Sequence, residues 1–201
     1  MTPAPGSSTA RLPHATTLPE GHRWWRVADE AWADPLDPTW ADHVGGRWNS
    51  PGDGPTLYLN LDVDTARAQI ARLLDGSPID PEDLRDDAPF VLVPVALPSR
   101  QRVADATTDT GLVALGLPSS YPLTARGHGV RWPPCRRGAR AARDAGLRGV
   151  LARSAATPDG HGRELAWFPA RGAAARRDGE LLPFIEWRHA VAQGSSVDPG
   201  S

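Results

Sequence analysis

The stretch from Gly45 to Asn60, GGRWNSPGDGPTLYLN, constrains the fold more than any other part of the chain. Its two leading glycines allow positive φ and close approach of the backbone to a ligand, because neither carries a Cβ. Pro51 and Gly52 fit a tight turn, and the TLYL segment that follows favours a strand. Two interpretations are open at this level. The stretch is either a hairpin turn with Trp48 as a core residue, or an anion-binding loop in which Arg47 supplies the charge.

The rest of the chain alternates strand and helix patterns without a strict βαβ repeat. This predicts an α+β fold with mixed or antiparallel sheets. Pro94 lies inside an apolar run and requires an edge position or a bulge. The segment from Asp29 to His43 is expected to be a loop. The expected strands are 22–27, 56–59, 90–97, 149–154, 164–169 and 181–187, and the expected helices are 62–75 and 133–145.

Length and composition fit a single domain over residues 21–190, flanked by disordered tails at 1–20 and 191–201. The 201 residues are 40% hydrophobic and carry a formal net charge of −2, which gives no general affinity for nucleic acid or an anionic membrane. The N-terminus lacks the apolar core of a signal peptide, and no window is apolar enough to span a membrane. A cytoplasmic protein is expected.

The residue inventory excludes several mechanisms. All 22 basic residues are arginine, so Schiff-base chemistry and a Walker-type phosphate lysine are impossible. Cys135 is the single cysteine, which excludes an intramolecular disulfide and a thiolate metal cluster. The six histidines are scattered, and no nucleophile elbow or dinucleotide fingerprint is present. We therefore expect neither a metal nor a bound cofactor.

Arginines are concentrated in the second predicted helix, at positions 136, 137, 140 and 143. The first interpretation is a solvated helix face, and the alternative is a patch for an acidic partner or RNA. Nucleic acid is the less favoured partner. Arginine also binds phosphate in a bidentate manner, and Trp and Tyr rings stack on flat bases, so the opening stretch suits a nucleotide or dinucleotide.

Several of these segments, in this order along the chain, resemble the RES domain family. The resemblance extends over roughly residues 23–169, and its most specific part is the glycine-glycine-arginine-tryptophan loop followed by a tyrosine strand. The segments that carry it are Trp25-Arg26-Val27, Gly45 to Gly52, Leu57-Tyr58-Leu59, the helix from Thr65 to Leu74, Gly149 to Ala155 and Leu165 to Phe168. The family is named after an arginine, a glutamate and a serine.

The resemblance implies an ADP-ribosyltransferase-like fold and a toxin of a toxin–antitoxin pair that cleaves or phosphorolyses NAD, here a substrate. It also implies an Xre-like helix-turn-helix antitoxin as partner. By position, Arg26 and Arg47 would hold the pyrophosphate or ribose, Tyr58 would stack near the nicotinamide ribose, and Ser154 would hydrogen-bond nicotinamide or its ribose. Trp48, Asn49 and Ser50 complete the expected substrate-binding set.

At the position of the family's glutamate this chain has Gln69. A glutamate there would stabilise the positive charge that develops on the ribose, whereas an amide carries no charge. A charge about 4 Å away is worth roughly 4 kcal/mol at an effective dielectric near 20, or roughly a thousandfold in rate. Asp62 and Glu164 are the candidate substitutes, but a helix cap and a surface position are expected for them.

Three functions follow. The first is an NAD-consuming enzyme of reduced activity with Arg26, Arg47, Gln69 and Ser154 as catalytic residues. The second is a nucleotide-binding module without chemistry, and the third is an RNA-binding protein that uses the arginine helix.

Overall fold

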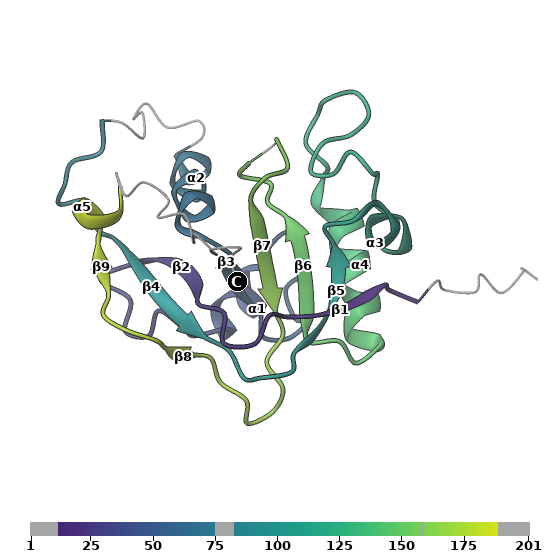
Figure 1. The fold of residues 1–201 in the computed structure, drawn as a ribbon, viewed down its shortest axis with the longest axis horizontal. Helices are drawn as coiled ribbons and strands as arrows, with labels where there is room; N and C mark the ends of the chain where they lie inside the picture. Colours follow the sequence, from purple (N-terminus) through teal and green to yellow (C-terminus); the bar gives the residue numbers. More distant parts are fainter. Residues whose placement is uncertain (1–11, 75–82, 158, 189–201) are drawn as a thin grey trace, which may run out of the picture.

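The computed structural model describes residues 12–74, 83–157 and 159–188, and its centre is one nine-stranded sheet (Figure 1). The strand order is β1-β5-β6-β7-β3-β2-β4-β8, and β9 also pairs with β4. The strands are β1 (Ala15–Thr17), β2 (Trp24–Asp29), β3 (Leu57–Asn60), β4 (Phe90–Ala96), β5 (Arg102–Ala106), β6 (Gly149–Arg153), β7 (Arg163–Trp167), β8 (Arg176–Arg177) and β9 (Leu182–Pro183). The helices are α1 (Thr39–Val44), α2 (Val63–Leu73), α3 (Asp109–Ala114), α4 (Trp132–Asp144) and α5 (Phe184–Trp187).

The sheet is mixed, as the sequence predicted. β5 and β6 are parallel, and every other pairing is antiparallel. The predicted hairpin of β6 and β7 is present, with Leu151 opposite Leu165. α3 and α4 lie beside β5 and β6 at one end of the sheet, while α2 and α5 contact β2 and β4 towards the other (Figure 1). The α+β prediction is confirmed.

Part of the segment predicted to be a disordered N-terminal tail is ordered. Ala15–Thr17 forms β1 and pairs antiparallel with β5, with Ala15 opposite Ala104. Leu18 follows and is buried in the core under β4 and β5. Pairing and burial thus order this part of the segment, although its local composition is that of a loop. Residues 1–11 and the predicted tail at 191–201 lie outside the described residues.

Pro94 lies opposite the gap between β8 and β9. The sequence predicted an edge position or a bulge, and the structure has neither. β9 pairs with Val91 and Leu92, and β8 pairs with Val95 and Ala96, so neither ladder includes Pro94. Its carbonyl accepts from the backbone N–H of Asp178 over 2.9 Å. The N–H and C=O of a strand residue point to the same side, so a backbone N–H at position 94 would point towards β8 and β9. Neither strand pairs with Pro94, so the N–H that proline lacks is not required there.

Two local predictions were wrong. Residues 39–44, expected to be loop, form α1, which begins directly after Pro38. The expected strand at 181–187 is only Leu182–Pro183 and continues as the short helix α5, whose Phe184 and Trp187 are buried. Both errors concern segments of six or fewer residues, where tertiary packing outweighs local pattern.

The two longer helices form as predicted. Asp62 caps α2, and its carboxylate accepts from the backbone N–H of Thr65 over 2.7 Å. α4 begins with proline in its first turn and buries Cys135, Ala139 and Ala142 against the sheet. The Gly76 predicted to end α2 lies outside the described residues. Of the helices in the described ranges, none is both long and apolar enough to cross a membrane.

Candidate functional site

The glycine-rich loop between α1 and β3 is held in one conformation by buried hydrogen bonds. Tyr58 Oη accepts from the backbone N–H of Trp48 over 2.9 Å and donates to Asn49 Oδ1 over 2.7 Å. A Cβ on Gly46 would lie 2.3 Å from Tyr58 Oη, so only glycine fits there without displacing the tyrosine. Gly45 has φ of +76°, a second reason for glycine at the loop entrance. The loop is therefore rigid.

The arginines of α4 hold this loop from the opposite side. Arg136 Nε donates to the carbonyl of Gly46 over 2.9 Å, and Arg140 pairs with Asp53 over 2.9 Å. The expectation of a solvated arginine face is thus wrong for the half-buried Arg136, but it holds for Arg140, whose side chain is 55% exposed. Arg137, between them, is exposed and matches it.

Arg143 makes the most contacts of the α4 arginines. Its guanidinium donates to Thr56 Oγ1 over 2.7 Å and to the carbonyls of Gly54 and Pro55. It also lies over the ring of Phe168, 3.7 Å from the ring centre. Burial lowers the pKa of Arg143 from its usual value. Arg143 thus holds residues 54–56 at the end of the loop, directly before β3.

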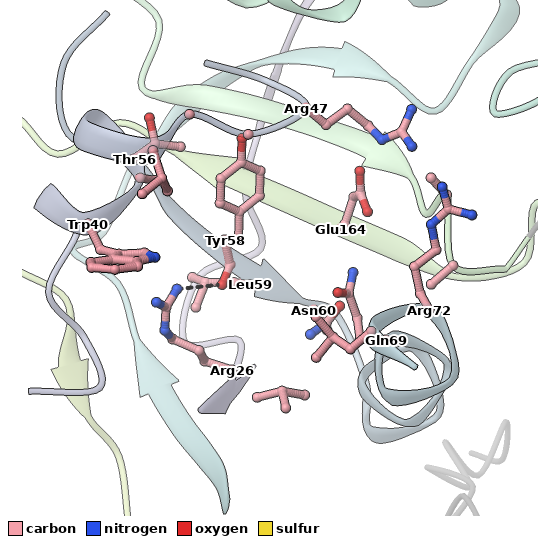
Figure 2. A pocket seen from close by; sticks show the side chains of 18 of the residues that line it. Arg26, Trp40, Arg47, Thr56, Tyr58, Leu59, Asn60, Gln69, Arg72 and Glu164 are labelled. Carbon is pink, nitrogen blue, oxygen red and sulfur yellow. Dashed lines mark hydrogen bonds between the residues drawn. The ribbon is translucent and has the colours of Figure 1, made fainter. Parts of the chain in front are cut away.

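A cavity of about 370 Å³ opens beside the loop, between α1, α2 and the central strands (Figure 2). Four of the predicted site residues line it, from four different elements: Arg26, Arg47, Tyr58 and Gln69. The structure therefore brings these four residues together, although Arg26 and Gln69 are 43 positions apart in the sequence. The other lining residues are Val27, Trp32, Trp40, Ala41, Val44, Gly45, Gly46, Thr56, Leu59, Asn60, Arg72, Leu73, Trp132, Ala155, Ala156 and Glu164.

Arg26 is a largely buried cation at the base of the cavity. It donates to the carbonyl of Tyr58 over 3.2 Å, the dashed contact in Figure 2, and its guanidinium lies 5.6 Å from the ring centre of Trp32. Burial lowers its pKa to about 10, against the raising effect of Asp34 and Asp37. Its buried Nε has no hydrogen-bond acceptor among the described residues. Arg26 therefore has donor capacity left for an anion.

Arg47 enters the cavity from the glycine loop. It donates to the carbonyl of Val130 over 2.9 Å, which anchors one arm of the guanidinium. Gln69 faces the cavity from α2, and Arg72 lines it one turn later. These positions agree with the residues expected to meet the substrate, while their roles stay predictions.

Glu164 is the residue whose placement differs most from expectation. Instead of lying at the surface, it is 6% exposed and reaches the cavity from β7. Trp48 Nε1 donates to its Oε1 over 3.0 Å, and Ser154 Oγ to its Oε2 over 3.4 Å. Burial raises the pKa of the carboxyl group, and the hydrogen bond from Trp48 and the charge of Arg47 oppose that rise. It is the one carboxylate among the described residues that line this cavity.

Four predicted site residues lie behind the cavity wall. Ser154 and Trp48 are fully buried and contact Glu164, while Asn49 is fully buried and contacts Tyr58. The backbone N–H of Ser50 donates to Asp53 over 2.8 Å, in the turn. None of these four belongs to the cavity lining. Sequence order indicated the neighbourhood correctly but not which side chains face the cavity.

Asn60 is a lining residue that the sequence reasoning missed. It pairs with Glu164 across β3 and β7, and its Nδ2 donates to the carbonyl of Trp25 over 3.4 Å. Its buried Oδ1 has no donor among the described residues. The available signal was the strand alternation, which puts Asn60 on the same face as Tyr58.

The mouth of the cavity is ringed by exposed apolar side chains. Trp40 is 63% exposed, Trp132 is 46% exposed and Trp32 is 45% exposed. Val44 and Leu73 complete the ring at 52% and 62%. These five residues, called the apolar rim below, account for most of the large exposed hydrophobic residues in the described ranges. Exposed apolar side chains grouped beside a cavity are typical of binding sites.

The cavity offers anion-binding groups and one carboxylate but no metal site. Across residues 12–74, 83–157 and 159–188, no group of three His, Cys, Asp or Glu side chains is placed to hold a metal ion.

Comparison with known proteins shows the family and the fold of the chain. The family model of the RES domain matches residues 23–185. A chain of the M. tuberculosis MbcT–MbcA toxin–antitoxin complex has the same fold, with a TM-score of 0.63 and 23% identity, covering 89% of this chain and 92% of that chain. No curated protein matches. The family model matches well over half of the 201 residues of this chain, and the chain therefore belongs to the RES domain family.

Proposed function

We propose that this protein is a toxin that consumes NAD by breaking the bond between nicotinamide and ribose. The observation that carries the proposal is the convergence of Arg26, Arg47 and Arg72 on one cavity from β2, the glycine loop and α2. Arginine forks bind the two phosphates of a dinucleotide in a bidentate manner. The free Nε of the buried Arg26 supports an anionic ligand, because an unpaired buried donor is costly without one.

The shape and the walls of the cavity support a dinucleotide over a free phosphate. Its volume of about 370 Å³ lies in the range of small-molecule sites. Exposed rings of Trp32 and Trp40 lie beside Arg26, where they can stack on a base while the arginine binds phosphate. Asn60 Oδ1 is a free acceptor for a ribose hydroxyl.

Incubation of the purified protein with NAD tests the proposal directly. Chromatography should show nicotinamide released, with ADP-ribose formed in water and ADP-ribose 1-phosphate formed if inorganic phosphate is the acceptor. Arg47→Ala should reduce the rate. Tight NAD binding without any nicotinamide release, both with and without inorganic phosphate in the buffer, would instead support the nucleotide-binding module that the neutral Gln69 suggests.

We further propose that the toxin acts in the cytoplasm and is neutralised by an antitoxin, with an Xre-like helix-turn-helix protein as the expected partner. The similar solved structure is that of a toxin–antitoxin complex. The apolar rim offers a protein partner a surface directly at the cavity mouth. Expression of the toxin alone should arrest growth, and co-expression of a small helix-turn-helix protein encoded by the adjacent gene should restore it. Unimpaired growth with folded toxin present would contradict this part.

A further inference from the structure

We propose that Glu164 supplies the negative charge that stabilises the ribose cation during cleavage, with Trp48 and Ser154 as its positioning residues. The inference deepens the proposed function and rests on it. It moves the reacting carboxylate from α2, where Gln69 stands, to β7 on the central sheet.

The first argument is the charge inventory of the cavity. Within the described ranges, Arg26, Arg47 and Arg72 give the cavity three cationic groups, whereas Glu164 is the one carboxylate that lines it. Gln69 lines the same cavity but is neutral. Figure 2 shows the Glu164 carboxylate beside the central cavity, between Arg47 and Gln69 in that view. Among the described lining residues, Glu164 is therefore the one side chain that can carry a negative charge opposite a cation that forms in this cavity.

The second argument is how Glu164 is held. Trp48 Nε1 and Ser154 Oγ are neutral donors, one to each carboxylate oxygen. Within the described part of the chain, Glu164 has no Arg or His partner closer than the 4.0 Å of an ion pair. Its charge is oriented without being neutralised by direct contact. A fixed, desolvated charge stabilises a transition state better than a mobile one, because nothing has to reorganise as the bond breaks.

The chemistry balances with water as the co-reactant. The bond between ribose C1′ and the nicotinamide nitrogen breaks, and its electron pair leaves with neutral nicotinamide. Positive charge is then shared by C1′ and the ring oxygen, and the carboxylate of Glu164 faces it. Water adds to C1′, the proton that it loses passes to solvent, and the products are nicotinamide and ADP-ribose. A neutral amide at Gln69 can orient a ribose hydroxyl but cannot offset this charge.

Three variants compared at saturating NAD test the assignment. Glu164→Gln keeps the shape and should lower kcat about a thousandfold, the effect of removing one charge near 4 Å at an effective dielectric of about 20. Gln69→Ala loses a hydrogen bond and should lower kcat about tenfold or less. Glu180→Gln alters an exposed carboxylate between β8 and β9 and should leave kcat unchanged. ADP-ribose, which lacks the charged leaving group, should bind wild type and Glu164→Gln with the same affinity.

Ser154→Ala separates positioning from direct participation. Loss of its hydrogen bond should move the acidic limb of the kcat profile to higher pH, whereas Glu164→Gln should abolish that limb. Near-wild-type kcat in a folded Glu164→Gln variant would overturn the inference while leaving NAD cleavage intact. Loss of ADP-ribose binding in that variant would also overturn it, because the role would then be binding. Absence of turnover by the wild type would overturn the proposed function and this inference together.

Discussion

Trp48 donates its indole N–H to Glu164 over 3.0 Å and so joins the glycine loop to β7 across the wall of the cavity. Both residues are buried, and Glu164 alone of the two lines the cavity. The tryptophan is thus a core residue and a support for the carboxylate at once. The interpretation of Trp48 as a core residue is confirmed, while the interpretation of the loop as an anion-binding element stays a prediction.

The pH dependence of Trp48→Phe tests this relationship. Trp48 lowers the pKa of Glu164 against the larger effect of burial, so phenylalanine should raise that pKa further. If the ionised carboxylate is the active form, the activity of the variant should begin to rise at a higher pH than that of wild type. A pH–rate profile of kcat measures the shift. Superimposable profiles would show that the indole N–H does not act on the catalytic carboxylate.

The stability of the folded protein should fall with rising pH over the range in which the activity is expected to rise. The pKa of Glu164 is raised above its ordinary value of 4.5, so the folded protein holds this proton when the unfolded chain has lost it. As pH rises from about 4.5 through the raised pKa, this group therefore lowers the free energy of unfolding. Chemical denaturation of wild type and Glu164→Gln across pH measures the difference. The variant should lack this decline, and parallel curves would contradict it.

Arg47→Ala should weaken nucleotide binding. Hydrogen bonds to charged groups contribute about 1.5–3 kcal/mol, which predicts roughly a tenfold to hundredfold loss in ADP-ribose affinity. Calorimetric titration measures it, with Arg171→Ala, an exposed arginine before β8, as the matched control. Arg47 also anchors to Val130, so melting curves are needed beside the titration. Equal affinity in a folded Arg47→Ala protein would exclude Arg47 from the anion site.

Gly46→Ala should loosen the loop from within. Its Cβ would lie 2.3 Å from Tyr58 Oη and 2.9 Å from Asn49 Oδ1, so the tyrosine must move and its buried hydrogen bonds must break. Overpacking of this kind costs about 1–3 kcal/mol. The control is Gly129→Ala, where a Cβ meets nothing within 4 Å. Thermal unfolding compares the two, and equal melting temperatures would show that the loop adapts without strain.

Arg143→Ala distinguishes a structural arginine helix from an RNA-binding one. Its contacts to the loop and to Phe168 predict a loss of about 2 kcal/mol or more in stability. Arg137→Ala, on an exposed side chain of the same helix, should be nearly neutral. If instead α4 binds RNA, both substitutions should weaken salt-dependent RNA affinity to similar degrees.

The long periodic elements could be predicted because their local pattern and their burial agree. Asp62 signals the start of α2, and the small residues of α4 repeat on its buried face. β1 and α1 could not be predicted this way. The three residues of β1 form a strand because they pair with β5, and the six-residue helix α1 depends on the residues it packs against. The local sequence does not indicate these tertiary contacts.

The sequence predicted the neighbourhood of the cavity but not which side chains line it. The position of Arg47 in a glycine-rich loop indicated a ligand contact, and it does line the cavity. Ser154 directly follows β6 and Glu164 lies in β7, ten residues later, yet Ser154 does not line the cavity and Glu164 does. No periodicity in the sequence reports it.

A crystal structure of Glu164→Gln with NAD tests the central claim most directly, because slow turnover should leave the dinucleotide intact. The account predicts phosphate oxygens within hydrogen-bond distance of Arg26 or Arg47 and the nicotinamide ribose C1′ facing position 164. A dinucleotide bound outside the cavity, or one whose C1′ faces away from position 164, would contradict it.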